Sequence, residues 1–175
     1  MELEIIKVIQ SAGSEALDIF CKTISHLSSY IGFIFWLVIF FIFYKRRFAI
    51  TFGITYGISI GFNYLLKYLI DRPRPFEVDG AIINKMQTVG QSFPSGHSVS
   101  AAIICCFLGY WIINKIKNKW LRGLLISLLT IFIILVVFSR MYLGQHYLSD
   151  TIAGIVLGTG YSIIAFFILK KRSKN

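Results

Sequence analysis

Charged residues are scarce in this sequence. Only 15% of its 175 residues are Asp, Glu, Lys or Arg, whereas 56% are hydrophobic. A soluble domain of this length would carry more charge on its surface, so the composition excludes an ordinary soluble core. The few charges lie in short stretches between long apolar runs. We therefore predict one all-α domain, residues 1–175, that forms a polytopic bundle of membrane helices.

Cysteines are also few, and Cys21, Cys105 and Cys106 form neither a Cys-x-x-Cys pair nor a Cys/His ligand pattern. We expect them to be small buried hydrophobes, and we expect no disulfide framework, no metal and no cofactor. Acidic residues number only 8 against 18 basic residues. In a soluble protein this balance would suggest nucleic acid. Here no basic stripe alternates with exposed aromatics, so we exclude a nucleic-acid partner.

About five apolar runs are predicted to cross the bilayer, at residues 27–44, 48–70, 94–113, 123–138 and 151–169. The preceding residues 1–29 mix charges with apolar residues at helical spacing, with a polar break at 10–14. This pattern favours an amphipathic helix on the membrane surface, and a sixth span is the alternative. Residues 30–169 would then form the transmembrane core, and residues 170–175 a basic tail. Gly53, Gly57 and Gly61 form a doubled GxxxG stripe, which predicts close approach of a neighbouring helix.

Five spans place alternate connections on opposite sides of the membrane. One side collects 11 basic residues and no acidic residue: Lys45, Arg46, Arg47, Lys115, Lys117, Lys119, Arg122, Lys170, Lys171, Arg172 and Lys174. The positive-inside rule places this side, with the C-terminus, in the cytoplasm of a cell-membrane protein. The polar loops then all face the extracytoplasmic side, and they carry Lys67, Arg74, His97, Arg140, His146 and Asp150.

His146 and Asp150 are four residues apart, so on a helix they would share a face. The carboxylate can accept a hydrogen bond from one ring nitrogen, which leaves the other nitrogen free to attack a substrate. Arg140 adds a planar fork of donors suited to phosphate or carboxylate. The alternative is structural: Asp150 caps the following helix, and His146 is an interfacial side chain.

Ser95-Gly96-His97 stands at the predicted start of a helix, where free backbone N–H groups can bind an anion. Together with the cations Lys67 and Arg74, this arrangement suits a phosphate dianion. A second histidine, His97, can protonate the leaving oxygen. No metal is required, because basic side chains can neutralise charge on the phosphoryl oxygens.

Three segments of the sequence resemble the three-part signature of the type-2 phosphatidic acid phosphatase superfamily. They are Lys67-x6-Arg74-Pro75, Pro94-Ser95-Gly96-His97 and Ser139-Arg140-x5-His146-x3-Asp150. The resemblance implies that His146 attacks phosphorus, that Asp150 holds His146 and that His97 is the general acid. It also implies that the phosphoryl oxygens are bound by Lys67, Arg74, Ser95, Gly96 and Arg140. Arg72 lies outside the signature, so we interpret it as a supporting surface charge.

The small bacterial members that the chain resembles act on undecaprenyl diphosphate or phosphatidylglycerol phosphate. We therefore expect a phosphorylated lipid as substrate, and the loop from Phe76 to Phe93 is the only segment large enough to contact its chain. Two other functions remain open: an intramembrane serine hydrolase with Ser95 as nucleophile, and an anion or phospholipid carrier. His26 has no motif around it and is expected to be interfacial. The sequence indicates no oligomeric state.

Overall fold

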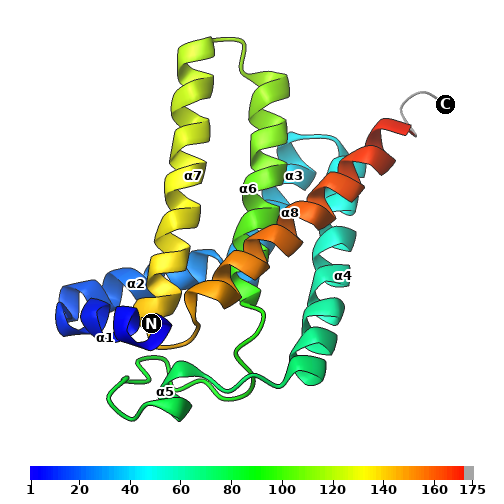
Figure 1. Ribbon diagram of the computed structural model, residues 1–175. Coiled ribbons are helices and arrows are strands. Elements are labelled where there is room, and N and C mark those ends of the chain that lie inside the picture. The colour runs from blue at the N-terminus through cyan, green and yellow to red at the C-terminus, as the bar shows by residue number, and fades with distance from the viewer. Residues whose placement is uncertain (172–175) are drawn as a thin grey trace.

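The computed structural model describes residues 1–171, and within them the chain is entirely helical (Figure 1). The elements are α1 (Glu2–Ser11), α2 (Glu15–Leu27), α3 (Tyr30–Phe43), α4 (Arg46–Ile70), α5 (Pro75–Val78), α6 (Gly96–Lys115), α7 (Lys119–Tyr142) and α8 (Leu148–Lys171). The predicted all-α class is confirmed. Of the predicted basic tail, residues 172–175 lie outside the described residues.

Four segments are long and apolar enough to cross a membrane, and they contain α4, α6, α7 and α8. The first predicted span differs, because α3 has only 14 residues and a helix of that length is about 21 Å long. It qualifies as a span only together with α2, from which it is bent by 48°. The bend lies where Ser29 caps α3 by accepting a hydrogen bond from the N–H of Ile31.

The central helix of the bundle is α6, which packs against α3, α4, α7 and α8. In the most apolar stretch of α6, 61% is buried inside the bundle. In the most apolar stretch of α7, only 6% is buried. A helix that is apolar on all sides belongs inside a bundle, and α6 fits that rule. Phe107 of α6 lies between Phe48 and Phe52 of α4, with ring centroids 5.1 and 5.0 Å apart.

Of the predicted glycine stripe, Gly53 faces α3, because a Cβ there would lie 3.6 Å from Cδ1 of Leu37, an ordinary van der Waals contact. The prediction of a close helix contact at Gly57 and Gly61 is wrong. A methyl group added to Gly57 or Gly61 would meet nothing within 4 Å. The close approach is instead between α8 and α6, where a Cβ on Gly154 would lie 2.6 Å from the carbonyl oxygen of Ser95. A Cβ on Gly158 would lie 2.5 Å from the carbonyl oxygen of Val99. Spacing alone does not tell which glycine stripe faces a helix and which faces lipid.

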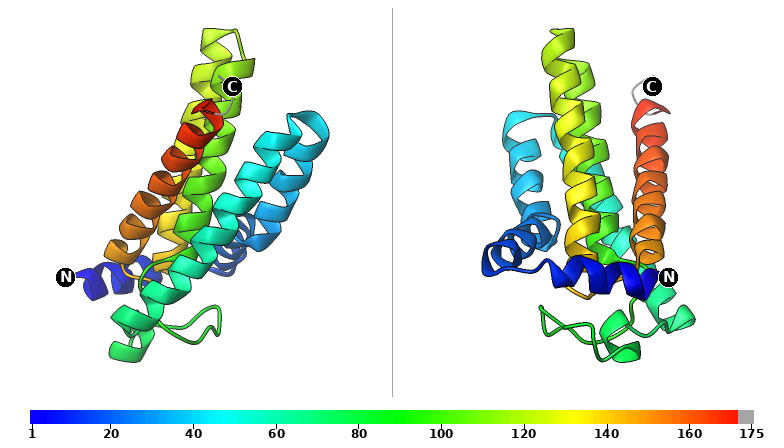
Figure 2. Two further views of the ribbon diagram at one scale, coloured as in Figure 1. Left: turned by 90° about the vertical axis from the view of Figure 1, so that its right-hand side faces the viewer. Right: turned by 60° about the vertical axis from the view of Figure 1, so that its left-hand side comes forward.

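The N-terminal segment forms two helices, α1 and α2, that lie across the end of the long helices rather than along them (Figures 1 and 2). The predicted polar break separates them, and the Ser14 side chain caps α2 by accepting from the N–H of Leu17. This orientation suits helices on a membrane surface. Their position at the interface stays a prediction.

The two ends of the bundle differ in chemistry. At one end lie the α3–α4 turn, the α6–α7 connection and the end of α8, which carry basic residues and no acidic residue (Figure 2). At the opposite end lie α1, α2, the long loop around α5 and the connection between α7 and α8 (Figure 1). The loops that were predicted to share one side of the membrane therefore do lie together.

Candidate active site

A pocket of about 530 Å³ opens at the second end of the bundle. Six of the eight residues selected from the sequence line it: Lys67, Arg74, Gly96, His97, Arg140 and His146. They come from α4, the α5 loop, α6, α7 and the α7–α8 connection, so the fold gathers segments far apart in the sequence. The other two, Ser95 and Asp150, are fully buried and support the pocket from behind.

The position of His146 depends on a sharp turn after α7. Gly144 adopts a left-handed backbone with φ of +74°, and a Cβ there would lie 2.5 Å from the carbonyl oxygen of Ile83. Only glycine fits both conditions. The turn brings the His146 N–H back to the carbonyl oxygen of Arg140, 3.3 Å away. His146 therefore lies in the connection and not on a helix, which corrects the predicted shared helical face.

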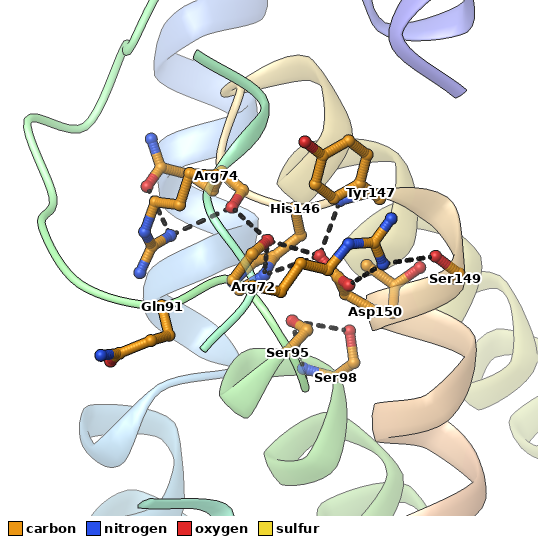
Figure 3. Close-up of polar contacts among 12 residues, drawn as sticks. Arg72, Arg74, Gln91, Ser95, Ser98, His146, Tyr147, Ser149 and Asp150 are labelled. Atoms are coloured by element: carbon orange, nitrogen blue, oxygen red, sulfur yellow. Dashed lines mark hydrogen bonds and ion pairs between the residues drawn. The ribbon is translucent and has the colours of Figure 1, made fainter. Parts of the chain in front are cut away.

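Asp150 lies in the first turn of α8, and one of its carboxylate oxygens, Oδ2, faces the connection. This oxygen accepts a hydrogen bond from the N–H of Tyr147 at 2.9 Å and another from the hydroxyl of Ser92 at 2.5 Å. The Nδ1 atom of His146 lies 3.6 Å from the same oxygen (Figure 3). Asp150 therefore accepts a hydrogen bond at the start of α8 and also lies next to His146. The alternative interpretation of His146 as an interfacial side chain is wrong, because His146 is buried.

Arg74 and Lys67 tie the long loop to the pocket. The Arg74 guanidinium donates to the carbonyl oxygens of Gly90 and Gln145, at 2.6 and 3.0 Å. The Lys67 ammonium donates to the carbonyl oxygen of Gln91 at 2.5 Å. Both cations are thus held by neutral carbonyl groups, so their positive charge stays available to an anion.

Arg140 is fully buried in the last turn of α7. One of its terminal nitrogens donates to the hydroxyl of Ser25 in α2, whereas its Nε is buried with no hydrogen-bond partner. A buried donor without a partner costs free energy unless a ligand satisfies it. An anionic oxygen in the pocket is the group that would do so.

Ser95 acts as the N-cap of α6. Its hydroxyl accepts hydrogen bonds from the N–H of Ser98 at 3.4 Å and from the Ser98 hydroxyl at 3.1 Å. Gly96 and His97 follow in the first turn and line the pocket. The start of the helix therefore faces the pocket as predicted, with the Ser95 hydroxyl behind it.

Several residues of this site were missed from the sequence. Gln145 is fully buried and accepts from Arg74 through its side-chain oxygen at 3.1 Å. His26, interpreted as interfacial, lines the pocket with His97. Arg72, interpreted as a surface charge, contacts the buried Asp150. Gln145 could have been found from the sequence, because it is a polar residue next to His146. No feature of the neighbouring sequence marks His26 or Arg72 as part of the site.

Known proteins share this sequence pattern and fold. The PAP2 superfamily model matches residues 48–174. Phosphatidylglycerophosphatase B of Bacillus subtilis is 32% identical over 110 residues, which cover 61% of this chain and 48% of that protein. An undecaprenyl-diphosphatase of Sulfolobus acidocaldarius is 28% identical over 121 residues, which cover 69% of this chain and 54% of that protein. The chain thus spans about half the length of the curated relatives it matches.

A solved structure agrees in fold. The crystal structure of a transmembrane PAP2-type phosphatidylglycerolphosphate phosphatase from Bacillus subtilis superposes with a TM-score of 0.85 at 23% identity, covering 97% of this chain and 85% of that one. This likeness confirms the fold. The family match over residues 48–174 confirms the family that the three motifs indicated. The chain is a multi-pass membrane protein and belongs to the PAP2 superfamily.

Proposed function

We propose that this protein is a membrane phosphatase that removes phosphate from a phosphorylated lipid through a phosphohistidine intermediate. One observation carries the proposal. A single pocket holds three histidines and three cationic side chains, and a buried carboxylate stands next to one of those histidines, His146. Cations bind the phosphoryl group, and a histidine paired with a carboxylate attacks it.

The geometry supports a separate role for each of the two nitrogens of His146. Nδ1 faces Asp150, so Nδ1 carries the proton and Nε2 keeps the lone pair for attack. In the first step, Nε2 bonds to phosphorus, the bond from phosphorus to the leaving oxygen breaks, and His97 protonates that oxygen. In the second step, water gives a proton to His97 and attacks phosphorus. The phosphorus–nitrogen bond breaks, and inorganic phosphate is released.

The substrate class follows from the surroundings of the pocket. Its wall includes Tyr30, Ile60 and Tyr64 on helices that face the membrane, so a lipid can reach it from the bilayer. In the loop predicted to contact the lipid, Ile82 is buried in a cluster with Ile6, whereas Val89 is 87% exposed. The names of the matched relatives suggest phosphatidylglycerol phosphate or undecaprenyl diphosphate. We propose a phosphorylated membrane lipid of this kind.

We further propose that the pocket faces the extracytoplasmic side of the cell membrane and that the C-terminus is cytoplasmic. The basic connections lie at the end of the bundle opposite the long loop around α5 and the α7–α8 connection (Figure 2), and residues of that loop and connection line the pocket. The positive-inside rule places basic connections in the cytoplasm.

The alternatives fit less well. A serine hydrolase needs a reactive serine in the pocket, but the Ser95 hydroxyl is fully buried and caps α6. A carrier binds anions without cleaving them, and it gives no role to the contact between His146 and Asp150. Carrier sites also tend to lie near the membrane midplane, whereas this pocket lies at one end of the bundle.

The direct test is phosphate release by the purified full chain in detergent. Phosphatidylglycerol phosphate and undecaprenyl diphosphate are compared as substrates, each with and without a metal chelator. We expect release that is unchanged by the chelator, because cationic side chains neutralise the phosphoryl charge. No release from either lipid by folded protein would contradict the proposed substrate class, and release that the chelator abolishes would contradict the mechanism.

The rate should also depend on pH in a defined direction. Burial lowers the pKa of His146 below its usual value, although the nearby carboxylate of Asp150 partly opposes the shift. The neutral, attacking form therefore persists as the pH falls through about 6.5, the ordinary histidine value. We expect a bell-shaped profile of kcat, measured at saturating substrate, with its acidic limb below that pH. A rate that rises steadily across the neutral range would contradict this pairing.

A further inference from the structure

Arg72 makes an ion pair with the carboxylate that supports His146. Its terminal nitrogen NH1 donates to Oδ1 of Asp150 at 2.5 Å and to the Ser149 hydroxyl at 2.8 Å (Figure 3). The guanidinium carbon also lies 3.8 Å from the centre of the Tyr147 ring. Arg74, two residues along the chain, points away from Asp150 towards the loop (Figure 3). The two arginines thus have separate partners.

Glu2, at the start of α1, completes this arrangement. Its carboxylate accepts from the second terminal nitrogen of Arg72 at 3.2 Å and from the N–H of Ser149 at 2.8 Å. Burial opposes ionisation of Glu2, but the hydrogen bonds from Ser149 and Arg72 outweigh it and lower its pKa. Glu2 is therefore charged at neutral pH, and it fixes both Arg72 and the first turn of α8.

The two oxygens of Asp150 consequently have different partners. Arg72 binds Oδ1, whereas Oδ2 faces Tyr147, Ser92 and His146. Asp150 is fully buried, so loss of Arg72 would leave Oδ1 as an unpaired buried charge. The carboxylate would then rotate or draw in water, and its distance to Nδ1 of His146 would change.

We propose that Arg72 and Glu2 are positioning residues of the active site, which hold Asp150 so that it orients and polarises His146. This inference rests on the proposed function. The family match begins at residue 48, whereas Glu2 lies in α1. The proposed site therefore includes a residue outside the matched part of the chain. Neither residue touches the pocket that would hold the substrate, so both act through Asp150.

The charges around His146 set the direction of the expected shift. The groups that face it or its supporting carboxylate are Lys67 of α4, Arg72 and Arg74 of the loop, His97 of α6, Arg140 of α7 and Asp150 of α8. Replacing Arg72 by glutamine removes one positive charge and leaves Asp150 less neutralised. The imidazolium form of His146 becomes more favourable, so its pKa should rise and the acidic limb should move to higher pH.

The experiment compares Arg72→Gln, Arg72→Lys and Glu2→Gln with Lys7→Gln in the full chain. Lys7 is the matched control, because it also joins α1 to the loop, through Asp79 at 3.2 Å, but it has no contact with Asp150. We expect Arg72→Gln to lower kcat by about 10- to 100-fold with little change in KM, since misplacement of about 1 Å costs that much. Arg72→Lys should recover part of the loss, Glu2→Gln should show a smaller loss, and Lys7→Gln should match the parent.

A second readout does not depend on turnover. Histidine-labelled protein in detergent gives the pKa of His146 by NMR, with His146→Asn used to assign the signal. A raised pKa in Arg72→Gln but not in Lys7→Gln supports the inference. Equal pKa values in the two variants would overturn it, as would equal kcat values. If the parent protein releases no phosphate, the proposed function fails, and the NMR comparison still decides whether Arg72 positions Asp150 against His146.

Discussion

Replacing His146 by alanine should lower phosphate release by at least about 10⁴-fold, because the proposed mechanism loses its nucleophile and not merely a binding contact. The pocket itself should survive, since the histidine lies in a connection whose path is set by Gly144 and by backbone hydrogen bonds to Arg140. The rate is measured on the lipid substrate, and circular dichroism with thermal unfolding confirms that the variant is folded.

His97→Ala provides the matched comparison, because the first step needs the proposed general acid only when the leaving oxygen needs a proton. With a phosphate ester that has an acidic leaving group, such as p-nitrophenyl phosphate, the first step, measured as a burst of p-nitrophenolate, should be restored in His97→Ala and not in His146→Ala. A covalent phosphoenzyme that is labile in acid should form in the parent and be absent from His146→Ala. If His146→Ala kept substantial turnover, or if p-nitrophenyl phosphate restored both variants equally, the assigned roles would be wrong.

Gly154→Ala should cause a clear loss of stability. The added methyl group would lie 2.6 Å from the Ser95 carbonyl oxygen and 2.8 Å from the Ser98 Cβ, so α8 and α6 would have to move apart. Overpacking of this kind costs about 1–3 kcal/mol. Activity should fall as well, because the displaced segment contains the start of α6 and the backbone N–H of Ser95 that donates to the Asp150 carbonyl oxygen.

Gly57→Ala is the control for this prediction, because the same change on α4 meets nothing within 4 Å. Alanine favours the helix by about 0.5–1 kcal/mol over glycine, so this variant should be as stable as the parent or slightly more stable. Unfolding in detergent by heat or by denaturant compares the two. A loss in Gly57→Ala equal to that in Gly154→Ala would show that the α4 stripe makes a contact with a partner.

The sequence was sufficient to predict the class of fold and most of the pocket. Lys67, His97 and His146 are polar residues at the ends of apolar runs, and such residues are costly in a bilayer unless they have a function. The limits of the helices also follow from local chemistry, as where Asn118 caps α7 by accepting from the N–H groups of Trp120 and Leu121. Both features, a polar residue at the end of an apolar run and a helix cap, can be recognised from a few neighbouring residues.

What the sequence could not predict depends on how distant segments pack. The contact of Arg72 with Asp150 spans 78 residues, and that of Arg72 with Glu2 spans 70. No periodicity links such positions. The same reason explains the error over Gly57 and Gly154, because both lie in equally good small-residue patterns and only the packing of α8 on α6 distinguishes them. The proximity of His26 to the pocket likewise follows from the docking of α2 against α7.

The bond between Glu2 and Ser149 also bears on the order of events during synthesis. The two residues are separated by 147 positions, so the first helix leaves the ribosome long before its partner is made. At the elongation rate of about 5–20 residues per second, α1 waits roughly 7–30 s for the start of α8 to emerge. During that time its apolar side, including Ile6, has no partner in the chain and can rest on the lipid surface. Insertion of α8 would then draw the early helix into place and complete the candidate active site as one of the last events of folding.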